Sequence, residues 1–282
     1  PGLGNVDVQA LTPTQAQYGI LQRVCDAIQA RRYEALLLHG VTASGKTEVY
    51  LQAIEAARAE RVRSAYLFRG YALLCPQQFE GLSPERDCTR PDCRRCLPPA
   101  RRLKHPLVRA SLALYARTVP HADLVVANSR YVAGLLERFL GVGAEVVHPA
   151  LDLRPAEAPA NDPGGYLLFV KPQRIKGLGL VAALARAMPG RRFAVAGELT
   201  GAAARALGGL DNVELLGWRS DMPAVYRGAR LLLGPSRWPE PFGRVFAEAG
   251  AVGCPSVAFR SGGIPEAVGA GGVLLEPGAG PE

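Results

Sequence analysis

The sequence lacks several features that mark particular classes of protein. No apolar run reaches the roughly eighteen residues that a membrane-spanning helix needs. The chain begins Pro-Gly-Leu-Gly, with neither an initiator Met nor a charged segment followed by an apolar one, so nothing in it predicts export. We therefore expect a cytoplasmic protein, whose six Cys are thiols or metal ligands rather than a disulfide framework.

Composition and charge fit a folded enzyme or binding protein. Apolar residues make up 48% of the 282 residues, which is enough for two domains with buried cores. The formal net charge of +8 favours phosphorylated ligands, polyanions or anionic lipid, although a general bias toward Arg and Ala gives the same excess.

Residues 1–65 contain a phosphate-binding loop pattern, Gly40-Val-Thr-Ala-Ser-Gly45-Lys46-Thr47. The spacing of apolar residues predicts helices over 14–31 and 46–57, with a strand over 35–39 between them. In such a loop the glycines turn backbone N–H groups toward a phosphate. Lys46 reaches the terminal phosphates, and the Thr47 hydroxyl holds Mg²⁺.

With Leu11–Gln15, the stretch Leu38–Ile54 closely resembles the opening of the helicase core of the primosomal replication-restart helicase. The resemblance implies an ATP-binding fragment of a DNA helicase as an alternative function. A motor of that kind also needs an acidic motif after a later strand and an arginine finger. No Asp-Glu pair ends an apolar strand downstream, so we expect a vestigial loop and no DNA partner. Residues 60–70 mark the end of this resemblance.

From Gly165 onward, short apolar runs alternate with segments of helix or loop length. The runs are 166–170, 193–196, 213–215, 229–233, 256–259 and 272–275. This alternation predicts an α/β fold in which helices wrap a parallel sheet. In such sheets ligands bind beyond the carboxyl ends of the strands, so the loops after these runs are the candidate site.

The segment Pro235–Ala249 places Glu240 in a loop and Glu248 two helical turns later. We expect the helix to begin at Phe242 or Gly243. Carboxylates accept hydrogen bonds from paired sugar hydroxyls, and a glycine at a helix N-terminus lets backbone N–H groups approach a diphosphate. Two solvated charges at a helix end are the alternative interpretation.

This acidic pair, set in Pro-Glu-Pro-Phe-Gly, resembles the signature of the family-four retaining glycosyltransferases, or glycosyl transferases group 1. The resemblance extends from about residue 66 to 282 and includes Tyr71–Gln77, Ala122–Val132 and Glu145–Pro149. It implies a GT-B-like fold of two Rossmann-like lobes.

The resemblance also implies a division of the chain. A truncated or hybrid acceptor lobe with a Cys-rich insert is expected over 66–154, and a nearly complete nucleotide-sugar-binding lobe over 155–282. Residues 155–163, rich in Pro, Ala and acidic residues, are the expected linker.

Several donor-binding positions match the family. By resemblance, Glu240 has the catalytic position at the donor sugar and Glu248 binds the ribose hydroxyls. Lys176 matches the lysine that neutralises the donor diphosphate, while either Lys171 or Arg174 must serve as the second cation. The remaining matched positions are Gly177, Gly243, and Gly262 and Gly263 in the second Gly-rich loop.

The resemblance implies transfer of a hexose from a nucleoside diphosphate sugar with retention of configuration and without a catalytic metal. The acceptor, whether a glycan, a lipid or a small molecule, is not defined. Arg69-Gly70 stands where the family has His-Asp, so an inactive acceptor lobe is the alternative. Trp218 is expected beside the nucleobase or in the core.

Four cysteines have a spacing that permits a structural zinc site: Cys75, Cys88, Cys93 and Cys96. Free thiols in a surface insert are the alternative. The Arg and Lys residues of this insert are expected to form a solvated basic loop or to contact an anionic acceptor or a membrane surface.

Overall fold

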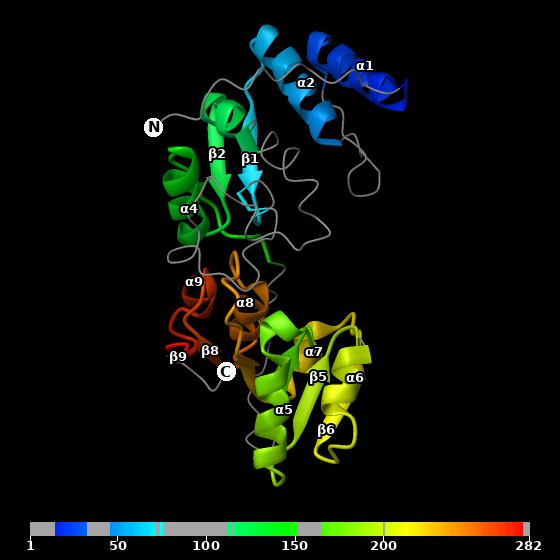
Figure 1. The fold of residues 1–282 in the computed structure, drawn as a ribbon, viewed down its shortest axis with the longest axis vertical. Helices are drawn as coiled ribbons and strands as arrows, with labels where there is room; N and C mark the ends of the chain where they lie inside the picture. The colour runs from blue at the N-terminus through cyan, green and yellow to red at the C-terminus, as the bar shows by residue number, and fades with distance from the viewer. Residues whose placement is uncertain are drawn as a thin grey trace. The chain divides into compact units, whose positions relative to one another are not determined.

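The computed structural model describes residues 15–32, 46–71, 74–75, 112–113, 115–151, 165–199 and 201–278. The chain forms two compact units (Figure 1). The first consists of residues 1–68, 91–126 and 136–145, and the second of residues 69–90, 127–135 and 146–282. The division expected from sequence, at residues 65 and 155, stays a prediction.

The N-terminal elements follow the sequence expectation in part. Helices α1 (Gln15–Gln29) and α2 (Lys46–Ala59) pack together, as their apolar spacing predicts. A three-stranded sheet follows with the order β1-β2-β3, formed by Ala65–Phe68, Leu124–Ala127 and Glu145–Val146. Strand β1 lies in the segment where one family resemblance ends and the other begins. The chain therefore continues into a sheet at that point.

The second unit is built on a six-stranded parallel sheet with the order β6-β5-β4-β7-β8-β9. Its strands in chain order are Tyr166–Val170, Phe193–Ala196, Val213–Gly217, Ala229–Gly234, Ser256–Phe259 and Gly272–Leu275. Each begins at the residue predicted from its apolar run. Strand β5 is buried throughout, whereas the edge strands β6 and β9 expose some of their residues. Counted within this unit, the order is 3-2-1-4-5-6, that of a doubly wound dinucleotide-binding fold.

Helices cover both faces of this sheet (Figure 1). Along β4 the side chains alternate, so that Leu168 enters one core and Phe169 the other. The Phe169 core contains residues of α5 (Leu178–Ala187) and α6 (Gly201–Leu207). The Leu168 core contains residues of α7 (Met222–Arg227), α8 (Arg244–Ala251) and α9 (Ile264–Val268).

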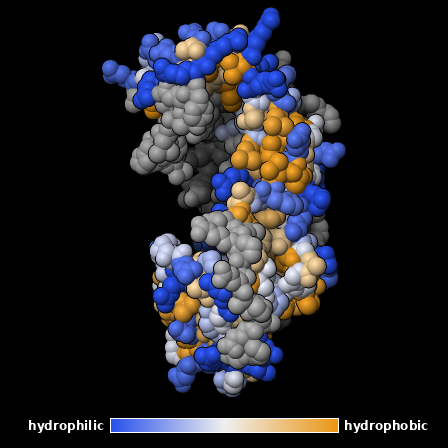
Figure 2. All heavy atoms as spheres, turned by 180° about the vertical axis from the view of Figure 1, so that it is seen from behind, coloured by the Kyte–Doolittle hydropathy of each residue, from blue (hydrophilic) through white to orange (hydrophobic). Residues whose placement is uncertain are grey.

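The surface mixes polar and apolar residues. Figure 2 shows hydrophobic residues exposed among hydrophilic ones. Trp218, just after β6, is 76% exposed, so its expected alternative place in the core is wrong. Within the described parts of the chain, no helix combines the length and apolarity that crossing a membrane requires.

Candidate functional site

The candidate site lies at the middle of the parallel sheet, where the strand order reverses between β4 and β7. Strands β4 and β7 are neighbours, but β4 leads into α5 on one face and β7 leads into α8 on the other. The loops after the two strands, residues 171–177 and 235–243, therefore leave the sheet in opposite directions. A ligand-binding position is expected between such loops, at their switch point.

The two loops contact each other closely at Gly177. This residue has a φ of 93°, and a Cβ added to it would overlap the Pro235 carbonyl. The buried Ser236 hydroxyl lies 3.4 Å from the Ile175 carbonyl and 3.1 Å from the Trp238 carbonyl. Glycine at 177 thus allows the β4 loop to pack directly against the β7 loop.

Lys176 and Glu240, both singled out from sequence, form an ion pair between the two loops. The distance from Lys176 Nζ to Glu240 Oε1 is 2.7 Å, and the two side chains are 15% and 11% exposed. The ammonium also lies 4.5 Å from the centre of the Trp238 ring, a cation–π distance. Burial lowers the pKa of Lys176, Glu240 opposes that effect, and the nearby charge of Lys171 lowers the pKa further.

Lys171 is the cation whose charge acts on Lys176. Its φ is 59°, a left-handed conformation that is uncommon for a residue other than glycine, and its N–H donates to the Ala196 carbonyl. Arg174, the other candidate for the second cation, begins the short 3-10 turn that ends at Lys176. Both candidates for the second cation thus lie in the loop that carries Lys176, and the choice between them stays a prediction.

The second Gly-rich loop packs against the backbone that carries Glu240. Glu240 and Gly262 form a parallel β-bridge, and the Gly263 N–H donates to the Glu240 carbonyl at 2.7 Å. A Cβ at Gly262, whose φ is 61°, would overlap the backbone of Glu240, and one at Gly263 would overlap the Pro241 carbonyl. Both glycines are thus required by close packing of the two loops.

Glu248 lies in α8 and has partners different from those of Glu240. Helix α8 begins at Arg244 with Gly243 as its N-cap residue, close to the predicted start. The Tyr226 hydroxyl donates to Glu248 Oε2 at 3.0 Å, and Arg244 Nη2 lies 3.4 Å from Oε1. Burial, followed by the Glu248 charge, raises the pKa of Tyr226. Glu248 is thus oriented by a buried hydroxyl, in the second turn of α8.

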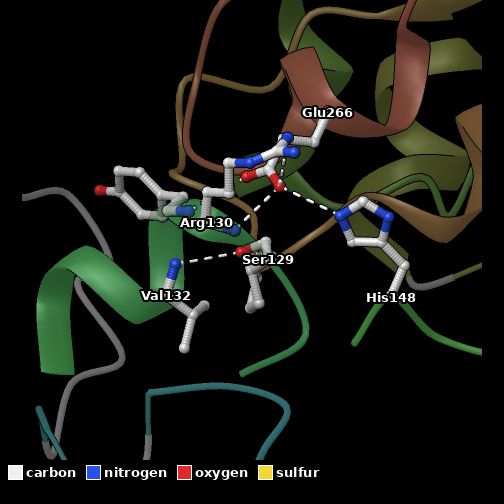
Figure 3. A network of polar contacts seen from close by, with 7 residues as sticks. Ser129, Arg130, Val132, His148 and Glu266 are labelled. Atoms are coloured by element: carbon white, nitrogen blue, oxygen red, sulfur yellow. Dashed lines mark hydrogen bonds and ion pairs between the residues drawn. The ribbon is translucent and has the colours of Figure 1, made fainter. Parts of the chain in front are cut away.

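Glu266, in the first turn of helix α9 after the second Gly-rich loop, contacts the start of helix α4 (Arg130–Leu140), as Figure 3 shows. Its carboxylate accepts hydrogen bonds from the Arg130 N–H at 2.8 Å and the Tyr131 N–H at 3.0 Å. His148 Nε2 lies 3.2 Å from the same carboxylate. Ser129 completes the start of the helix, because its hydroxyl oxygen accepts from the Val132 N–H at 3.0 Å.

Two groups of predicted ligand residues lie largely outside the described part of the chain. Of the phosphate-loop residues, Gly40 and Gly45 lie outside it, and Lys46 and Thr47 are described only as the first backbone positions of α2. Of the four zinc candidates, Cys88, Cys93 and Cys96 lie outside it, while Cys75 is buried and forms no disulfide. Both sites stay predictions.

Sequence reasoning missed the aromatic residues of the site. Tyr71 contacts Trp238 and Tyr226 contacts Glu248, and no sequence motif predicts a role for any of the three aromatic residues. The Arg244–Glu248 pair had a signal, since oppositely charged residues four apart on a helix face each other. The other contacts join distant segments and leave no local pattern.

Residues 168–282 match the family model described as "Glycosyl transferases group 1". A D-inositol 3-phosphate glycosyltransferase from Segniliparus rotundus is 37% identical over 191 residues, covering 56% of this chain and 42% of the relative. One of the same name from Mycolicibacterium smegmatis is 30% identical over 189 residues, covering 57% and 43%. The chain thus spans less than half the length of these curated relatives. None of these matches supports a helicase-like segment.

Solved structures resemble the fold over nearly the whole chain. Anabaena Alr3699/HepE, solved with UDP and glucose, has a TM-score of 0.61 at 22% identity, and the match covers 95% of this chain and 71% of the HepE chain. Sucrose-phosphate synthase from Thermosynechococcus elongatus has a TM-score of 0.55 at 17% identity and covers 95% and 67%. The protein thus has the α/β fold of the GT-B glycosyltransferases, and its residues 168–282 are similar to the group 1 glycosyltransferases.

Proposed function

We propose that the chain binds a nucleoside diphosphate sugar, a UDP-sugar in the first instance, and transfers the sugar to an acceptor with retention of configuration. The observation that carries this proposal is the Lys176–Glu240 pair, which lies between the loops that follow β4 and β7. This is the switch point of the sheet, where nucleotides bind in doubly wound folds. Anabaena Alr3699/HepE was solved with UDP-glucose, which supports the choice of base.

The side chains suit the parts of such a donor. Lys176 and Lys171 would offset the charge of the diphosphate, and the N-terminus of α8, with Gly243 at its mouth, would add backbone N–H groups. Glu248, oriented by Tyr226, would accept hydrogen bonds from the ribose hydroxyls. Glu240, in the loop that precedes α8, would accept hydrogen bonds from the hydroxyls of the donor sugar.

The chemistry follows from where charge develops. As the bond from the sugar to the diphosphate breaks, negative charge grows on the phosphate and positive charge on the sugar ring. A buried ammonium stabilises the first, and a carboxylate stabilises the second. The acceptor hydroxyl would attack from the face that the diphosphate leaves, and the phosphate would take its proton. Cationic side chains supply the charge neutralisation, so no step of the scheme uses a metal ion.

For the acceptor we propose a phosphorylated cyclitol as the first candidate. The support is the name of the curated relatives, D-inositol 3-phosphate glycosyltransferase, at 30–37% identity. Because the chain spans less than half of those relatives, transfer to inositol phosphate is a separate question from donor binding. Glycan and lipid acceptors are the other classes to test.

Calorimetric titration tests donor binding directly. The full chain is titrated with UDP-glucose, UDP, GDP-mannose and ADP-glucose. We expect UDP-glucose to bind, and we expect Glu248→Ala and Lys176→Met to weaken its binding at least about tenfold, as loss of a charge-assisted contact does. Glu276→Ala removes an exposed glutamate that pairs with Arg260 and is the matched control. Absence of binding to all four nucleotides, or equal binding by all variants, would refute the proposal.

A further inference from the structure

Three consecutive backbone carbonyls around Glu240 receive hydrogen bonds from three distant segments. The Tyr71 hydroxyl donates to the Pro239 carbonyl at 2.6 Å, the Gly263 N–H to the Glu240 carbonyl at 2.7 Å, and the Ser129 hydroxyl to the Pro241 carbonyl at 2.5 Å. All these residues belong to the second compact unit. The backbone on both sides of Glu240 is therefore fixed by groups outside its own loop.

The sequence of the loop makes external donors important. Pro239 and Pro241 have no N–H groups, so this stretch has few ways to form hydrogen bonds with itself. A buried carbonyl without a donor costs free energy, and the chain relaxes to find one. The Tyr71 hydroxyl therefore holds the Pro239 carbonyl, and with it the peptide that precedes Glu240.

Tyr71 also contacts the residue that borders Lys176. Its ring, which is fully buried, meets the Trp238 ring edge-on, with 5.9 Å between the centroids and an angle of 79°. The Trp238 ring in turn lies 4.5 Å from Lys176 Nζ. One side chain thus contacts the backbone beside the carboxylate and the ring beside the ammonium.

We infer that Tyr71 is a positioning residue for the donor sugar. Its hydroxyl fixes Glu240 where the carboxylate meets the sugar, and its ring fixes Trp238 and thereby Lys176. This inference rests on the proposed function, because it assigns Tyr71 a part in binding the same donor. Tyr71 acts through these two residues and is not itself a catalytic residue.

The test compares two tyrosine variants in the full chain. Tyr71→Phe removes only the hydroxyl bonded to Pro239. Tyr166→Phe is the matched control, because the Tyr166 hydroxyl donates to the Val225 carbonyl at 2.7 Å in the same unit, on a segment outside the loop. Calorimetry gives the affinities for UDP and for UDP-glucose, and their ratio measures what the sugar adds. Thermal unfolding reports the stability of each variant.

We expect Tyr71→Phe to bind UDP as the wild type does and to lower the ratio about 3- to 10-fold, the effect of one hydrogen bond. Tyr166→Phe should leave both values unchanged. Glu240→Gln should lower the ratio in the same direction as Tyr71→Phe. A purely structural role for Tyr71 would instead weaken UDP and UDP-glucose binding equally.

The outcomes separate the two proposals. If the wild-type chain binds neither ligand, the proposed function is wrong and this inference falls with it. If it binds both and the ratio is the same in Tyr71→Phe and Tyr166→Phe, only this inference is overturned. Should Tyr71→Phe not fold, Trp238→Leu tests the second contact. It should weaken UDP binding through Lys176, and unchanged UDP affinity would overturn the inference.

Discussion

The ion pair between Lys176 and Glu240 gives a prediction whose size follows from burial. Its N···O distance of 2.7 Å is almost the same as the 2.8 Å between Arg260 and Glu276, but the side chains are 15% and 11% exposed in the first pair and 52% and 76% in the second. Distance is therefore matched, and exposure to solvent is the variable that differs.

Lys176→Met should leave the Glu240 carboxylate in a largely buried place without its partner. Loss of one partner of a fully buried pair costs ~3–5 kcal/mol, and the small remaining exposure reduces this to about 2–4 kcal/mol. Arg260→Met should cost about 1 kcal/mol or less, because exposed pairs are screened by water and salt.

Double-mutant cycles measured by urea unfolding test this reasoning. One cycle uses Lys176→Met with Glu240→Gln, and the other uses Arg260→Met with Glu276→Gln. We expect a coupling free energy of about 2 kcal/mol in the first cycle and below about 0.5 kcal/mol in the second. Equal coupling in the two cycles would refute the argument that burial sets the strength of the Lys176–Glu240 pair.

Three further predictions concern a lysine, two glycines and two cysteines. Burial lowers the pKa of Lys176 in the folded chain below its ordinary value of 10.5, so between the folded and unfolded pKa values the unfolded chain binds more protons. The unfolding free energy of the wild type relative to that of Lys176→Met should therefore rise with pH in that range. A difference that does not change with pH in urea unfolding would contradict this. Gly262→Ala should lower the unfolding free energy more than Gly209→Ala does. Gly209 also has a positive φ, but there is open space around it, so its substitution should cost ~1–2 kcal/mol from backbone strain alone. Equal costs in chemical denaturation would count against the packing argument. Cys254 is fully buried, and burial raises its pKa to about 11. Mass spectrometry should therefore find that iodoacetamide modifies the partly exposed Cys25 well before Cys254. The reverse order would be inconsistent with the structure.

The strands of the second unit could be predicted from sequence because most of them are short apolar runs separated by helices or loops. All four residues of Phe193–Ala196, for example, are buried, so the strand is apolar throughout. Strand β1, Ala65–Phe68, was not predicted, because residues 60–70 were interpreted as the boundary between the two resemblances.

The candidate site could be predicted only where its residues share a loop or follow neighbouring strands. Lys176 and Glu240 were expected at one donor site because each follows a predicted strand and matches a position of the glycosyltransferase family, and the structure pairs them. The bond from Tyr71 to Pro239 joins residues 168 positions apart, and no local pattern encodes it. Such contacts depend on how the segments pack, which sequence spacing does not specify.

The anchors at residues 239, 240 and 241 bind main-chain oxygens rather than side chains. Side chains in this stretch can therefore be exchanged while the attachment is kept, which makes it a suitable place for a combinatorial library aimed at altered sugar preference. An insertion or deletion would shift the register of all three oxygens at once. Libraries of constant length should consequently yield many more folded members than libraries of variable length.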